Sequence, residues 1–164
     1  MAHSKAIASL LALLLLGGCA SLRWSVLRAF RAPGEHLTAL PEQIWDEYDC
    51  DSQDRPFFLV EKNELIPNRV EAGGEFGHRL VYVMCPARPT GVVRGRLATR
   101  IRFRGSPLMV EMDPRYEIKP GRWVVDAFVA LPENAEPGVY AYELEFESRT
   151  IDFAKSASFV VTGP

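Results

Sequence analysis

The sequence predicts an all-β fold, an antiparallel sandwich of about seven strands that begins near Pro56. Apolar and polar residues alternate from there onward, and this period of two residues is typical of a strand with one buried face. Turn-forming Gly, Pro and Asn residues interrupt the alternation at short intervals, as expected for a sandwich. The strands are expected near 56–62, 76–85, 92–104, 107–113, 122–131, 138–147 and 156–162. The predicted sandwich therefore occupies 56–164 and follows two segments of different character, 1–18 and 19–55.

The first segment, 1–18, has the features of a secretion signal. Lys5 provides a positive start, and the run from Ala6 to Leu16 is apolar except for Ser9. A membrane-spanning helix needs roughly 20 apolar residues, so this run is too short to be a spanning anchor. The run ends at Leu16-Gly17-Gly18-Cys19.

These four residues resemble the lipobox of bacterial lipoproteins. The resemblance implies cleavage before Cys19, lipid modification of its thiol, and attachment to a membrane through acyl chains. The residue after the cysteine is Ala20 and not Asp, which by analogy with Gram-negative lipoproteins implies the periplasmic face of the outer membrane. The inner membrane or another extracytoplasmic membrane remains open. The alternative is an uncleaved helix from Ala6 to Leu22 in which Cys19 is incidental.

The second segment, 19–55, is expected to be a lipidated tether because it lacks strand-like alternation. Leu22, Val26 and Phe30 are four residues apart, so a helix there would have one apolar face and could lie on an anionic bilayer. A flexible leash is the alternative. A short helix is also predicted at 41–48, because Pro41 suits the first position of a helix.

The charge balance gives no reason to expect a nucleic-acid partner. Lys5 is the one charged residue in 1–18, so the mature chain has 18 basic and 21 acidic residues, a net charge of −3. The partners expected are the membrane, through Cys19, and an envelope protein or an anionic envelope component.

Two cysteines remain once Cys19 is lipidated, and they are expected to form a disulfide. Cys50 and Cys85 would lie in a compartment where disulfides persist, and an even number favours pairing. Closing a loop of this length stabilises a fold by about 3–4 kcal/mol in the chain-entropy description. Two free, buried thiols are the alternative.

Two stretches resemble immunoglobulin-like domains. Leu131 to Tyr140 is similar to the corner between the fifth and sixth strands, with Tyr140 at the tyrosine-corner position. Leu65 to Gly74 resembles the crossover of the first strand in bacterial immunoglobulin-like modules. No Trp lies on the third predicted strand, so kinship with antibody domains is not supported. Transthyretin-like sandwiches with the same strand spacing remain possible.

Two predicted strands carry opposite charges on one face. One face of strand 92–104 bears five arginines, and strand 138–147 bears three glutamates. They are Arg94, Arg96, Arg100, Arg102 and Arg104 on the first, and Glu143, Glu145 and Glu147 on the second. The third and sixth strands of an immunoglobulin-like sandwich are neighbours, so a cross-strand ladder of ion pairs is expected. Alternatively, the surplus of two arginines faces an anionic partner.

No group of residues has the spacing of a catalytic, cofactor or metal site. A calcium loop that begins at Asp49 would need a glycine and a glutamate where Asp54 and Val60 stand. The acidic cluster concerned is Asp46, Glu47, Asp49, Asp51 and Asp54. Nucleophile elbows and phosphate-binding loops are missing, and the mature chain has only His36 and His78. The sequence therefore predicts a non-catalytic binding or assembly module without a cofactor or metal.

Two other classes remain open from sequence. The first is a carbohydrate-binding or hydrolytic envelope protein, for which Trp45, Tyr48 and Tyr116 could form an aromatic platform. The second is a purely structural spacer.

Overall fold

The computed structural model describes residues 31–88 and 91–163. All of the secondary structure described lies in one compact unit, Pro33–Pro164. The predicted secretion signal, Cys19 and the proposed amphipathic segment up to Phe30 lie outside the described residues. In the part of the chain that is described, no helix is long and apolar enough to cross a membrane.

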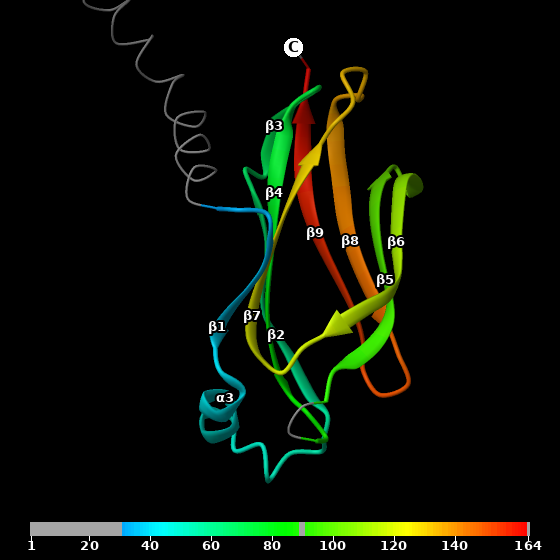
Figure 1. The fold of residues 1–164 in the computed structure, drawn as a ribbon. Coiled ribbons are helices and arrows are strands. Elements are labelled where there is room, and N and C mark those ends of the chain that lie inside the picture. The colour runs from blue at the N-terminus through cyan, green and yellow to red at the C-terminus, as the bar shows by residue number, and fades with distance from the viewer. Residues whose placement is uncertain (1–30, 89–90, 164) are drawn as a thin grey trace, which may run out of the picture. The chain divides into compact units, whose positions relative to one another are not determined.

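The unit is an all-β sandwich of two sheets, as the alternation predicts (Figure 1). The four-stranded sheet has the order β1 (Gly34–Ala39), β7 (Gly121–Ala130), β4 (Glu75–Cys85) and β2 (Phe57–Ile66). The five-stranded sheet has the order β3 (Arg69–Glu71), β9 (Asp152–Thr162), β8 (Gly138–Glu147), β5 (Val93–Phe103) and β6 (Ser106–Ile118). All neighbours are antiparallel except β3 and β9, which run parallel.

The two stretches that resemble immunoglobulin-like domains take up the expected structures. The chain leaves the four-stranded sheet at the end of β2 and enters the five-stranded sheet as β3, with Pro67-Asn68 between the two strands. The Tyr140 hydroxyl donates a hydrogen bond to the backbone carbonyl of Glu136 over 2.8 Å, as in a tyrosine corner. The sandwich therefore has immunoglobulin-like connections.

The core lies between the two sheets and is rich in aromatic side chains. Phe76 on β4 is fully buried and packs against Tyr142 and Phe159 of the opposite sheet, with ring centroids 5.7 and 4.6 Å away. Toward the other end of the sheets, Phe146 stacks on Phe153 at 5.7 Å. These side chains are the inward-facing members of the alternating strands, so the pattern that predicts the strands also defines the core.

A third apolar cluster lies on the outer side of the four-stranded sheet, under α3 (Pro41–Glu47). Ile44 of this helix is fully buried with Val83 of β4. The cluster also contains Cys50 and Cys85, whose Cα atoms are 5.9 Å apart across a disulfide. The predicted disulfide and the predicted helix near 41–48 are thus confirmed.

The predicted domain boundary at residue 56 differs from the structure, because 33–55 is part of the compact unit. Strand β1 adds to the four-stranded sheet through pairing with β7, and the disulfide fastens the segment after α3 to β4. β1 escaped prediction because it is an edge strand whose side chains are mostly exposed, so it shows no regular alternation. Its partner β7 also lies far along the chain, and no local pattern reveals such a pairing.

Candidate functional site

The arginines of β5 and the glutamates of β8 form a ladder on the outer face of the five-stranded sheet. The two strands are antiparallel, with Arg96 directly opposite Glu147 and Arg100 opposite Glu143. Arg96 pairs with Glu147 at 2.5 Å, and Arg102 reaches diagonally to Glu143 at 2.7 Å. Arg100 pairs with Glu145, and this contact holds the pKa of the Glu145 carboxyl below its usual value.

The predicted surplus of two arginines is wrong, because carboxylates outside β8 complete the ladder. Arg94 pairs with Glu117 of β6 at 2.7 Å, and Arg104 pairs with Glu136 at 3.3 Å. The sequence prediction ended the neighbouring strand at residue 113, so Glu117 was missed. All five arginines therefore have carboxylate partners, and exposed pairs of this kind contribute only about 0.2–1 kcal/mol each.

A hollow of about 370 Å³ lies beside the ladder, where β5, β8 and β9 run next to one another. Its charged lining consists of Arg100, Arg102 and Lys155 against Glu143 and Glu145. Lys155 is paired with the core residue Leu144, so its side chain lies on the other face of the sheet from the arginines. The charged side chains on the arginine face of the hollow therefore balance, with two guanidinium groups against two carboxylates.

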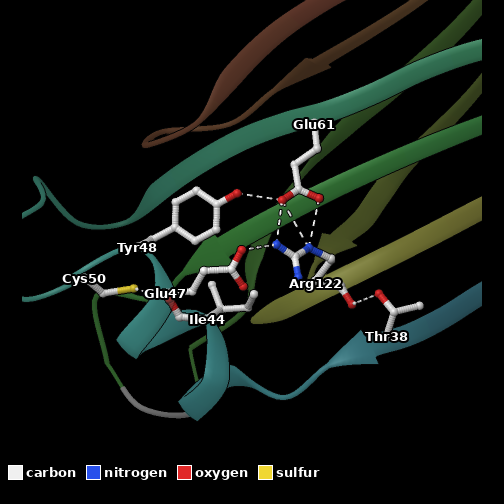
Figure 2. A network of polar contacts seen from close by, with 7 residues as sticks. All are labelled: Thr38, Ile44, Glu47, Tyr48, Cys50, Glu61 and Arg122. Atoms are coloured by element: carbon white, nitrogen blue, oxygen red, sulfur yellow. Dashed lines mark hydrogen bonds and ion pairs between the residues drawn. The ribbon is translucent and has the colours of Figure 1, made fainter.

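A second polar cluster joins α3 to the four-stranded sheet (Figure 2). Arg122 of β7 donates hydrogen bonds to Glu47 at 2.6 Å and to Glu61 of β2 at 2.9 Å. The Tyr48 hydroxyl donates to Glu61 at 2.6 Å. The Arg122 backbone carbonyl accepts a hydrogen bond from the Thr38 hydroxyl of β1 at 3.1 Å. One arginine thus links α3, β1, β2 and β7. The sequence did not predict this cluster because the partners of Arg122 are far apart along the chain.

The electrostatics of this cluster follow from the same contacts. Hydrogen bonding from Arg122 lowers the pKa of the Glu61 carboxyl, so Glu61 stays ionised. The hydrogen bond to that carboxylate raises the pKa of Tyr48, which therefore keeps its proton. Every charge in the cluster is used to hold α3 against the sheet, so we assign it a structural role.

The three aromatic side chains proposed as a glycan platform are not brought together. The Tyr48 hydroxyl is bound to Glu61, and Tyr116 packs against Phe146 of the sandwich core. Trp45 lines a separate hollow of about 300 Å³ with Pro41, Glu42, Asp46 and Pro86. The Arg55 guanidinium lies 5.0 Å from the centre of the Trp45 ring.

The two histidines of the mature chain are also far from each other. His36 is on the edge strand β1, whereas His78 is buried between the sheets. A His78 ring nitrogen lies 2.8 Å from the Asn63 side-chain oxygen, and the ring packs on Tyr142 with centroids 4.7 Å apart. Burial lowers the pKa of His78 to about 4, so this imidazole is neutral at physiological pH and packs as part of the core.

Metal binding finds no geometric support in the described ranges, where no group of three or more His, Cys, Asp or Glu side chains is arranged to hold an ion. Two members of the acidic cluster instead contact basic or polar neighbours. Glu47 pairs with Arg122, and Asp51 accepts a hydrogen bond from the Trp45 indole at 3.0 Å.

No family model and no curated protein matches the sequence. Solved structures with a similar arrangement include an alkylpurine DNA glycosylase from Pseudomonas fluorescens, at 10% identity and a TM-score of 0.45, over 63% of this chain and 30% of that one. A β-glucosidase from Erythrobacter marinus has 13% identity and a TM-score of 0.45, over 65% and 15% of the two chains. A family 123 glycoside hydrolase from Clostridium perfringens has 15% identity and a TM-score of 0.45, over 80% and 26%.

These matches correct one expectation from the sequence, that the protein is not an enzyme. The three solved structures named above are enzymes, and this chain spans less than a third of each of them. The expectation rested on missing motifs, and catalytic carboxylates have no fixed sequence spacing that a motif search would find. A similarity at this level assigns no reaction or substrate to this chain.

Proposed function

We propose that the protein is an envelope lipoprotein, held on a membrane by acyl chains on Cys19, whose sandwich binds or assembles with an anionic envelope component. The lipobox supports the anchor, and Ala20 favours the periplasmic face of the outer membrane. The hollow beside the ladder supports the binding role and is the observation on which the proposal depends.

The hollow suits a phosphate or carboxylate group. Guanidinium groups bind such oxyanions through two parallel N–H donors, and Arg100 and Arg102 supply two guanidiniums at the lining. An incoming oxyanion can take over donors now used by Glu143 and Glu145, because these pairs are partly exposed and therefore weak.

Replacing Arg100 and Arg102 together by Gln is expected to weaken capture of the partner severalfold, because the hollow loses both of its guanidinium groups. Stability should fall by no more than about 2 kcal/mol, since each partly exposed pair contributes at most about 1 kcal/mol. Crosslinking in intact cells, followed by identification of the trapped partner, measures the capture.

The matched control is the double replacement of Arg94 and Arg96 by Gln, because these arginines belong to the same ladder but do not line the hollow. Raised salt should mimic the loss in the Arg100 and Arg102 variant. If the two double variants capture the partner equally well, the hollow is not the binding site.

The second candidate is a carbohydrate-binding or hydrolytic envelope protein. The hollow beside Trp45 favours it, because the aromatic ring can stack on a sugar while the carboxylates of Glu42 and Asp46 accept hydrogen bonds from its hydroxyl groups. The crosslinking experiment separates the candidates: a glycan trapped beside Trp45 supports the second, and an anionic component trapped beside Arg100 supports the first.

A further inference from the structure

Strand β6 is a long sheet edge that the described part of the chain leaves uncovered. It is the last strand of the five-stranded sheet and pairs with β5 along one side only (Figure 1). It has 13 residues, whereas the edge strands β3 and β1 have three and six. The remaining edge strand, β2, approaches β9 of the other sheet, where the Asn63 amide donates to the Ser156 carbonyl over 3.5 Å. A long open edge is a template for pairing with another strand.

The same strand bears an exposed apolar stripe. Leu108, Val110 and Met112 alternate along β6 and are 59%, 51% and 58% exposed. Val110 is opposite Arg100 and Met112 is opposite Ala98, so these two side chains border the charged ladder on the outer face of the sheet. Leu108 lies at a β-bulge and instead lines a hollow with Ile101 and Met109. Three large apolar side chains more than half exposed on one edge strand are typical of a surface that another chain covers.

Two prolines limit the length of strand that can pair. Pro107 and Pro114 have no backbone N–H to donate to a further strand. They enclose the six residues Leu108–Asp113, which contain the whole stripe. An added strand can therefore form a regular ladder only along this short segment.

The segment is complementary to itself in the antiparallel direction. With a two-fold axis at Val110, this residue lies opposite the partner's Val110. Glu111 then faces the partner's Met109, so no like charges are opposed. An axis at Glu111 would instead oppose two Glu111 side chains, and an axis at Met112 would oppose Glu111 to the partner's Asp113.

We propose that β6 pairs antiparallel with β6 of a second copy of the chain, about a two-fold axis at Val110, and so joins two five-stranded sheets into one. The inference depends neither on the anchor nor on the hollow beside Arg100. An interface of six residues from each chain is smaller than a standard one, so the two copies exchange and are best detected by trapping.

The test is a cysteine placed at the axis of the full chain. Val110→Cys brings two thiols directly opposite each other, where Cβ atoms of paired strands are roughly 5 Å apart. Mild oxidation in cells should therefore give a disulfide-linked homodimer on a non-reducing gel, with at least a tenfold higher yield than the control variants.

Two controls separate this pairing from random collision. Met112→Cys lies on the same stripe but roughly 13 Å from its own counterpart, which is too far for a disulfide. Val139→Cys is on β8 and replaces a side chain that is 65% exposed. Equal dimer yields from all three variants, or a Val110→Cys link to a different polypeptide, overturn the proposal.

Discussion

Replacing Cys50 by Ala is expected to lower the free energy of unfolding by about 3–4 kcal/mol, because the unfolded chain regains the freedom that the cross-link removes. The bond closes a loop between residues 35 positions apart. The same change frees α3 from β4, so the buried cluster around Ile44 and Val83 loses its covalent support. Urea unfolding of the wild type and the variant measures the difference.

Reduced wild-type protein is the matched control, because it loses the same cross-link without any change of side chain. We expect its midpoint to shift in the same direction and by a similar amount as that of the Cys50→Ala variant. Full retention of stability after reduction would contradict the account, since it would mean that the segment after α3 is held without the bond.

Acidification from pH 6.5 to pH 4 is expected to remove about 3 kcal/mol of stability through His78 alone. The folded protein keeps this imidazole neutral down to a pKa of about 4, whereas the unfolded chain protonates it near pH 6.5. Between these values the unfolded state binds the extra proton, so the free energy of unfolding falls as pH falls and levels off below pH 4. Urea unfolding at intervals across this range follows the change.

His78→Gln is the matched variant, because an amide keeps a polar contact within reach of Asn63 and neither gains nor loses a proton at any pH used. Acid also weakens the ion pairs of Glu61 and Glu145, but those contributions are common to both proteins. The difference between wild type and variant therefore isolates His78. Parallel stability curves for the two proteins would show that His78 is not buried as described.

The features that local sequence patterns encode were predicted well. Inward side chains such as Phe76 and Phe146 alternate with polar ones, so the strands and the core follow from a period of two. Tyr140 and the turn before it predicted the tyrosine corner. The disulfide followed from the number of cysteines and from the compartment that the lipobox implies.

The features that depend on distant residues were not predicted. β1 pairs with a strand more than 80 positions later, and its own residues do not alternate. Arg94 is neutralised by Glu117, whose place on β6 depends on a register shift in the β5–β6 ladder. Arg122 likewise joins Glu47 and Glu61 only because three elements meet there. Pairings of this kind are set by the tertiary fold and leave no periodic signal.

The candidate site likewise has one part that local sequence patterns predict and one part that they do not. The ladder between β5 and β8 was predicted from two alternating strands. The hollow is also lined by residues 154–156 of β9, a strand that the sequence prediction began only at residue 156. Residues 154–156 are all exposed, so the start of β9 shows no regular alternation and its part in the hollow was missed.

The mass of the protein purified from membranes tests the central claim, an acyl-anchored envelope lipoprotein, most directly. The account predicts a mature chain that begins at Cys19, lacks residues 1–18, and carries the added mass of a diacylglyceryl group on the thiol. Cys19→Ser should leave the precursor uncleaved and without that group. A wild-type protein that still contains residues 1–18, or that begins at an unmodified Cys19, would contradict the account.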